Sequence, residues 1–271
     1  MLTKKDIISF GCLVCLGILA CSCNEQAQKA SEPRQDSSSE QSAQANDVAA
    51  NTGRGLRDYE KQLLGLIYPK ELLETARIHV GQPQLLPKNT VWGFIVHIAV
   101  QNDYGVTVGQ NIYFPEEPDT TKLWGIQWLT HELRHVQQYK QAGGLDPFGA
   151  AYVWYLTAGA VSLKPDSAYV NNPFENDARV YDSCIAELLG QRPELLKALA
   201  LAKKDRAEQI SREINKYASR YKEILRASLG KATKAPTTFR MADEKSFTID
   251  FHLRGEFTDP VGGEVDLRVD K

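Results

Sequence analysis

Residues 123–140, LWGIQWLTHELRHVQQYK, decide the fold expected of this chain. The stretch has no proline and a single glycine, and its apolar residues recur every three or four positions, so the pattern predicts one helix. One arc of that helix is apolar and should face a core: Ile126, Leu129, Leu133 and Val136. A second arc is polar: Gln127, Thr130, Arg134, Gln137 and Gln138. The third arc carries aromatic and titratable side chains: Trp124, Trp128, His131, Glu132, His135 and Tyr139.

Two histidines of the third arc lie four residues apart, in the order His131-Glu132-Leu133-Arg134-His135. On a helix this spacing is about 40° of rotation and roughly 6 Å of rise, so both imidazoles face one point. Neutral imidazole is a preferred ligand of Zn²⁺, and two rings on one rigid helix supply half of a tetrahedral shell. Glu132 lies beside the first ring, where its carboxylate can take a proton from a water that zinc polarises. The spacing therefore predicts a zinc site with Glu132 as catalytic base, and a chance occurrence of the motif is the alternative.

A third protein ligand is needed for a catalytic zinc, and because no third histidine follows closely, we expect a carboxylate from a later helix. Glu175 is the main candidate, and it lies at the start of a helix that Asn172 would cap and Pro173 would open. Ala178, one turn further on, would let this helix approach the first one closely. A capping box would explain Glu175 without a metal. Three other carboxylates remain as alternative ligands: Asp177, Asp182 and Glu187.

The rest of the pattern predicts a mainly helical α+β fold with a small sheet before the motif helix. The expected helices cover residues 56–76, with a break at Pro69, and then 150–163, 173–190 and 193–229. The segment 150–163 could instead be a lid over the site, and 193–229 could be one helix or two. The expected strands cover residues 77–80, 91–100 and 105–114. After Gly230, alternating residues at 247–251 and 265–269 predict a terminal hairpin or a loose tail.

The N-terminal 21 residues differ in composition from the rest. Lys4 and Lys5 precede an apolar run that is too short to suit a membrane span and that ends at Cys21. We interpret this as a lipoprotein signal cleaved before an acylated Cys21, with a plain cleaved signal and an uncleaved anchor as alternatives. Polar residues 22–55 predict a disordered linker, followed by a folded domain at 56–230 and the β-like segment at 231–271. The expected location is the bacterial cell envelope, with a lipid anchor holding the chain to the membrane on the periplasmic or surface side.

Charge and cysteine content exclude some classes of protein. The formal net charge is −2, and basic residues are scattered among acidic ones, so we expect no nucleic-acid partner. Beyond the signal and Cys21 only Cys23 and Cys184 remain, which predicts no disulfide framework. The other histidines are interpreted as structural or surface residues: His79, His97 and His252. Four tyrosines are candidate donors to an oxyanion beside the zinc, among which the sequence does not choose: Tyr152, Tyr155, Tyr169 and Tyr181.

Three stretches, Arg77–His79, Gly105–Phe114 and Leu129–Gln138, resemble the HExxH domain family associated with extracellular contractile injection systems. The resemblance implies a zincin-like fold of the gluzincin kind, in which the strand before the motif helix borders the substrate groove. It also implies that an ExxA motif on a following helix supplies the third ligand, and Glu175 to Ala178 fits that motif. Three residues depart from the pattern: Arg134 where a small residue is common, Gln137 where an apolar one is usual, and Arg179 where related gluzincins often carry aspartate.

The function expected from these observations is that of a zinc-dependent peptidase. His131, His135 and Glu175 would hold Zn²⁺, and Glu132 would act as base in hydrolysing peptide bonds of a peptide or protein substrate. One alternative is a catalytically inactive zincin-like lipoprotein that serves in binding or as a scaffold. Another is an amidase acting on cell-wall peptides, since the same zinc chemistry serves any amide.

Overall fold

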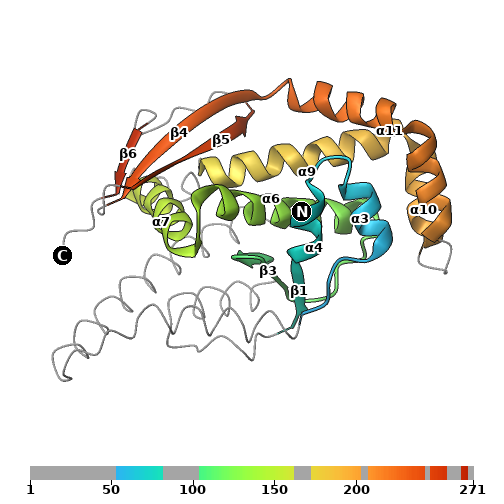
Figure 1. The fold of residues 1–271 in the computed structure, drawn as a ribbon, viewed down its shortest axis with the longest axis horizontal. Coiled ribbons are helices and arrows are strands. Elements are labelled where there is room, and N and C mark those ends of the chain that lie inside the picture. Colours follow the sequence, from blue (N-terminus) through green and yellow to red (C-terminus); the bar gives the residue numbers. More distant parts are fainter. Residues whose placement is uncertain are drawn as a thin grey trace.

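The structure is a computed structural model, and it describes residues 53–81, 104–161, 172–202, 207–241, 245–254 and 264–267. Two long helices, α6 (Leu123–Ala142) and α9 (Pro173–Gln191), pack along each other at its centre. In Figure 1, α9 lies between α6 and a layer formed by α11 (Ala207–Leu229) and a small sheet. A second small sheet lies on the opposite side of α6. The described part of the chain is thus a mainly helical α+β fold, as the sequence predicts.

Helix α6 confirms the predicted helix over 123–140 and continues to Ala142, where Gly143 ends it with a φ of 81°. Its apolar arc of Ile126, Leu129, Leu133 and Val136 is buried as expected. The polar arc is not a solvent-facing surface, because Thr130, Arg134 and Gln138 are also buried. The sequence pattern gave no sign of this burial. For Arg134 and Gln138 the burial follows from α9, whose Asp177 accepts hydrogen bonds from both side chains.

The sheet near α6 contains β1 (Arg77–Val80), β2 (Val106–Val108) and β3 (Asn111–Phe114), in the order β1-β3-β2. Strand β3 runs parallel to β1 and antiparallel to β2. The sequence predicts one strand over 105–114, and this is wrong, because the segment is a hairpin. Gly109 turns the chain with a φ of 64°, which most side chains would disfavour. The strand predicted at 91–100 lies outside the described residues.

The segment 56–76 folds as predicted into two short helices, α3 (Asp58–Leu64) and α4 (Lys70–Thr75). Pro69 precedes α4, where its missing N–H costs no helical hydrogen bond. Helix α7 (Leu145–Val161) begins five residues earlier than expected. Asn172 caps α9 by accepting a hydrogen bond of 3.0 Å from the backbone N–H of Phe174, as predicted. The segment 193–229 contains α10 (Pro193–Ala202) as well as α11.

The C-terminal segment forms a sheet of β4 (Thr233–Met241), β5 (Ser246–Leu253) and β6 (Glu264–Leu267), in the order β5-β4-β6. Strands β4 and β5 are an antiparallel hairpin, and β6 lies parallel to β4. The predicted hairpin therefore exists, but 247–251 pairs with β4 rather than with 265–269. The buried face of this hairpin packs Phe239 and Phe251 on Phe174 of α9, with ring centroids 5.9 and 5.0 Å away. This apolar contact explains why the segment is not a loose tail.

The predictions of a lipoprotein signal and of a disordered linker concern parts of the chain that the structure does not describe. The signal, Cys21 and nearly all of the linker lie before residue 53. Within the described residues, no helix is both long enough and apolar enough to cross a membrane. Cys184 is a buried free thiol on α9.

Candidate metal centre

Helices α6 and α9 bring three predicted ligands together. The Nε2 atoms of His131 and His135 lie 3.3 Å apart. Glu175 places Oε2 3.3 Å from His131 Nε2 and Oε1 3.3 Å from His135 Nε2. His135 and Glu175 are buried, and His131 is partly buried. These three side chains form a group that could hold a metal ion.

The spacing of this group fits a small tetrahedral metal. Ligand atoms bonded to one zinc at about 2.0–2.1 Å lie about 3.3–3.4 Å from one another, because a tetrahedron's edge is about 1.63 times its centre-to-corner distance. The 3.3 Å between the two Nε2 atoms matches that edge. The Glu175 carboxylate spans the two rings, with Oε2 3.3 Å from His131 Nε2 and Oε1 3.3 Å from His135 Nε2. Glu175 Oε2 is buried without a hydrogen-bond partner, as expected of an atom whose partner is a cation. The residues therefore fit a metal with nitrogen and oxygen ligands.

The charges around the group also favour a cation. Burial by itself would lower the pKa of His131, but the carboxylates of Asp182 and Glu175 raise it to about 10. Burial would raise the pKa of Glu175, but the two histidines hold it well below its usual range. Without a metal, the group thus draws a proton onto His131. A divalent cation can replace that proton and satisfy the same anionic surroundings.

Each ligand is held from behind by a further side chain. Nδ1 of His131 lies 3.2 Å from Asp182 Oδ2, and Nδ1 of His135 lies 2.9 Å from Gln138 Oε1. Because the Nδ1 atom of each histidine has a partner on one side of the ring, the Nε2 atom of each histidine faces Glu175 on the other side. Tyr152 donates a hydrogen bond of 2.6 Å to Glu175 Oε1. Such outer contacts fix the orientation of metal ligands.

Glu132, the predicted base, lies buried next to the group. Its Oε2 accepts a hydrogen bond of 2.8 Å from Thr107 Oγ1 on β2. A Cβ atom on Gly105 would lie 2.8 Å from Glu132 Oε1, so only glycine lets the backbone leading into β2 approach the carboxylate this closely. Burial raises the pKa of Glu132, and its contacts with His131, His135 and Thr107 only partly oppose this. A raised pKa suits a carboxylate that has to accept a proton near neutral pH.

The three alternative ligands lie elsewhere. Asp177 accepts a bond of 2.7 Å from Arg134 Nε. Glu187 accepts bonds from Ser228 Oγ and Lys231 Nζ at 2.5 and 2.7 Å. Asp182 contacts the outer nitrogen of His131 rather than Nε2. Asp182 follows Glu175 by two helical turns on the same face of α9, and this spacing could have indicated its role from the sequence.

The structure describes three of the four candidate oxyanion donors. Among these three, Tyr152 donates a hydrogen bond to Glu175 of the group. Tyr155 packs on Phe174, and Tyr181 lies under the guanidinium of Arg134, 4.4 Å from its carbon to the ring centroid. Tyr169 is outside the described residues, as is His97. Of the other histidines, His79 pairs with Asn111 and His252 lies against Tyr181, which agrees with structural roles.

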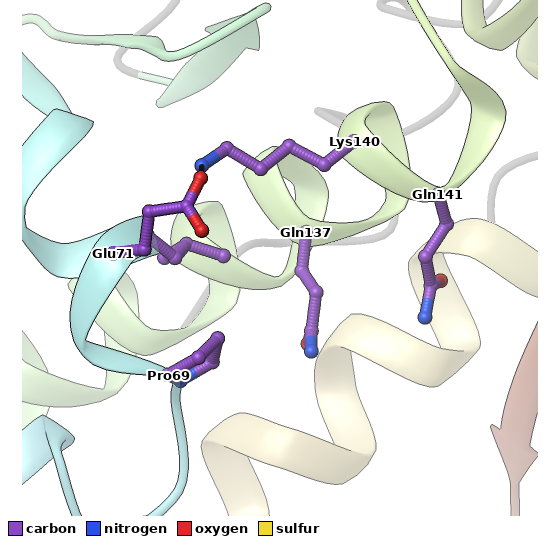
Figure 2. A pocket seen from close by; sticks show the side chains of 6 residues that line it. Pro69, Glu71, Gln137, Lys140 and Gln141 are labelled. Carbon is purple, nitrogen blue, oxygen red and sulfur yellow. Dashed lines mark hydrogen bonds and ion pairs between the residues drawn. The ribbon is translucent and has the colours of Figure 1, made fainter.

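A hollow on another side of α6 is separate from this group. Figure 2 shows Lys140 reaching from α6 to Glu71 on α4, where Nζ and Oε1 are 3.4 Å apart. The lining residues come from these two helices and the proline before α4: Pro69, Glu71, Leu72, Gln137, Lys140 and Gln141. None of these residues belongs to the candidate metal group, so the hollow is not part of the metal centre.

Asp182→Asn is expected to weaken metal binding by about 10–100-fold, the usual effect of removing an outer partner of a ligating histidine. The carboxamide keeps the shape of the side chain, but it lacks the negative charge that makes His131 a stronger donor. Competition against a chromogenic chelator measures the affinity, and Asp146→Asn at the exposed start of α7 is the matched control. Unchanged affinity in Asp182→Asn would show that the Asp182 contact does not support the ligand.

One comparison with known proteins gives a match. The model of the eCIS core domain family matches residues 100–143, a short part of the chain that contains the β2–β3 hairpin and α6. The match links the chain to extracellular contractile injection systems. No curated protein and no solved structure matches the chain significantly.

Proposed function

We propose that the protein is a zinc-dependent peptidase. The observation that carries this proposal is the group of His131, His135 and Glu175 beside the buried carboxylate of Glu132. The two Nε2 atoms lie 3.3 Å apart, and each lies 3.3 Å from one of the two Glu175 carboxylate oxygens. Two histidines and one glutamate would supply three protein ligands, the number typical of catalytic zinc sites, whereas closed structural sites supply four. When bound, zinc would act as a Lewis acid that polarises a substrate carbonyl and lowers the pKa of water toward about 7.

Glu132 supplies the proton transfer in this proposal. Its carboxylate takes a proton from the attacking water and passes it to the leaving amine, which must be protonated for the peptide bond to break. Thr107 holds Oε2, and Oε1 lies near the backbone of Gly105. Both neighbours restrict the rotation of the carboxylate, so it needs no reordering when a substrate arrives.

Strand β2 provides a surface for an extended substrate. It is an outer strand of the described sheet, and Thr107 on it contacts Glu132 directly. A peptide lying along β2 in extended form would pass beside the base and the metal ligands, which supports the groove implied by the family resemblance. This arrangement favours peptides or proteins as substrates. Cell-wall peptides are a second substrate class that the same chemistry would serve.

The proposed setting is the bacterial cell envelope, with the chain anchored through Cys21. It rests on the N-terminal sequence, where a basic start, an apolar run and a cysteine follow one another. The link to extracellular contractile injection systems is a further clue to the setting and does not identify a substrate. Metabolic labelling with a fatty-acid analogue, compared between the wild type and Cys21→Ser, tests the anchor. Equal labelling of both would exclude it.

Metal removal tests the proposed activity. The purified chain should release fluorescent peptides from a labelled unfolded protein, lose this activity with a zinc chelator, and recover it with added Zn²⁺ but not with Mg²⁺. Mg²⁺ is the control because it prefers six oxygen ligands over a site with two imidazoles. A panel of muropeptides run in parallel separates peptidase from cell-wall amidase. Zinc binding without hydrolysis of any of these substrates would favour the inactive binding or scaffold protein.

Thr107→Val is expected to lower kcat/KM about tenfold, because valine has the shape of threonine but cannot donate to Glu132. A hydrogen bond to a charged group typically contributes about 1.5–3 kcal/mol, enough for an effect of this size. Thr107→Ser keeps the hydroxyl and should stay within a few-fold of the wild type. If the serine variant lost as much activity as the valine variant, packing of the methyl group rather than the hydrogen bond would be responsible.

A further inference from the structure

Gln138 occupies a position between a metal ligand and the core of the fold. It is completely buried on α6, three residues after His135. Its Oε1 lies 2.9 Å from His135 Nδ1. Its Nε2 lies 3.1 Å from the backbone oxygen of Phe174 and 2.7 Å from Asp177 Oδ2. The side-chain amide of Gln138 therefore makes all three of these contacts with protein atoms.

The partners of Gln138 determine which way its amide points. The carbonyl oxygen of Phe174 can only accept a hydrogen bond. Asp177 also acts as an acceptor at both oxygens: Oδ2 accepts from Arg134 Nε at 2.7 Å and Oδ1 from the backbone N–H of His252 at 2.8 Å. Rotating the amide by 180° would set its oxygen against two acceptors. The amide nitrogen must therefore face Phe174 and Asp177, which leaves the oxygen to face His135.

This orientation fixes the protonation of the imidazole. An amide oxygen only accepts, so the Nδ1 atom of His135 has to carry the proton that fills the 2.9 Å contact. A neutral imidazole with its proton on Nδ1 has its lone pair on Nε2. That lone pair points to the place shared with His131 Nε2 and the Glu175 carboxylate.

We propose that Gln138 is a positioning residue that fixes the Nδ1–H tautomer of His135, and that Asp177 fixes the orientation of Gln138. Asp177 is itself held by β5, through the backbone N–H of His252, and β5 also accepts from Arg134 through the backbone oxygen of Asp250 at 3.0 Å. The C-terminal sheet thus braces one metal ligand through two side chains. The inference rests on the metal centre of the proposed function but not on peptidase activity.

The tautomer can be measured in the wild-type chain without any substitution. Nitrogen-15 NMR of the metal-free protein, at a pH where His135 is neutral by its own shifts, distinguishes a protonated Nδ1 from a protonated Nε2. We expect the proton on Nδ1. A proton on Nε2 would overturn the proposal, because the lone pair would then face Gln138 instead of the metal.

A variant pair tests the effect on metal binding. Gln138→Met keeps the volume of the side chain but removes the acceptor, so we expect zinc affinity to fall about 10–100-fold and the two tautomers of His135 to mix. Gln141→Met, on the exposed end of the same helix, is the control and should bind zinc as the wild type does. Wild-type affinity in Gln138→Met would overturn the proposal. If that variant does not fold, the NMR measurement on the wild type still decides. Neither experiment uses a substrate, so an inactive wild type would contradict the peptidase proposal alone.

Discussion

Glu132→Gln is expected to lower kcat/KM by about 10²–10⁴-fold while zinc content stays at the wild-type level, because general acid–base groups contribute about that much. This corresponds to about 2.7–5.4 kcal/mol of transition-state stabilisation. The carboxamide has the same shape as the carboxylate, and its oxygen can still accept the hydrogen bond from Thr107 Oγ1. What it lacks is the ability to take up a proton. Because Glu132 does not belong to the group of candidate metal ligands, the metal site should remain intact.

Hydrolysis and metal content have to be measured on the same preparations. The control is Glu208→Gln, the same substitution at an exposed position near the start of α11, which should leave both quantities unchanged. Hydrolysis by Glu132→Gln at the wild-type rate would contradict the proposed role of the base. A metal-independent activity in either protein would contradict the proposed function as a whole.

Asp177→Asn is expected to lower the free energy of unfolding by about 3–5 kcal/mol, the usual cost of removing one partner of a buried ion pair. Arg134 is 1% exposed and Asp177 is not exposed at all, and their Nε and Oδ2 atoms are 2.7 Å apart. With asparagine in place, the positive charge of Arg134 stays buried without compensation. Urea unfolding measures the change, and Asp146→Asn should stay within about 0.5 kcal/mol of the wild type.

A double variant distinguishes the ion pair from simple loss of packing. Arg134→Met together with Asp177→Asn leaves no charge at these two buried positions, so its cost should be smaller than the sum of the two single costs. Additive costs would show that the pair does not couple.

The dependence of stability on pH gives a second test of the ion pair. Burial would raise the pKa of Asp177, but Arg134 and His252 outweigh it and lower the pKa below its ordinary value. The stability that the carboxylate contributes is therefore present above its unfolded pKa, near 3.9, and is lost as the pH falls through the lower folded value.

The predictions that depended on local periodicity agree with the structure. Helix α6, the break at Pro69 and the cap at Asn172 follow from residues that are neighbours in the sequence. Errors arose where one residue changes the direction of the chain. The alternation of Val106, Val108 and Ile112 looks like one strand, yet Gly109 folds it into a hairpin. The partner of β5 could not be identified either, because strand pairing depends on contacts between distant segments.

The candidate site likewise contains some residues that the sequence could predict and others that it could not. Spacing on one helix was enough to pair His131 with His135. Glu175 was predicted because Ala178, one turn further on, would let the two helices approach closely, and because the pair fits the ExxA motif of the family that the chain resembles. The residues behind the ligands were not found. Arg134 was noted as a departure from the family pattern, but only packing of α6 against α9 shows that it pairs with Asp177. Gln138 was assigned to a polar arc with no indication that it is buried beside His135.

Anomalous diffraction at the zinc absorption edge, from crystals of the zinc-loaded chain, would locate the metal itself. We expect one strong peak bonded to His131 Nε2, His135 Nε2 and a carboxylate oxygen of Glu175, at about 2.0–2.2 Å from each. The Glu132 carboxylate should lie beside the remaining open position without bonding to the metal. A peak at other residues, or no peak at the three ligands in fully zinc-loaded protein, would contradict the account.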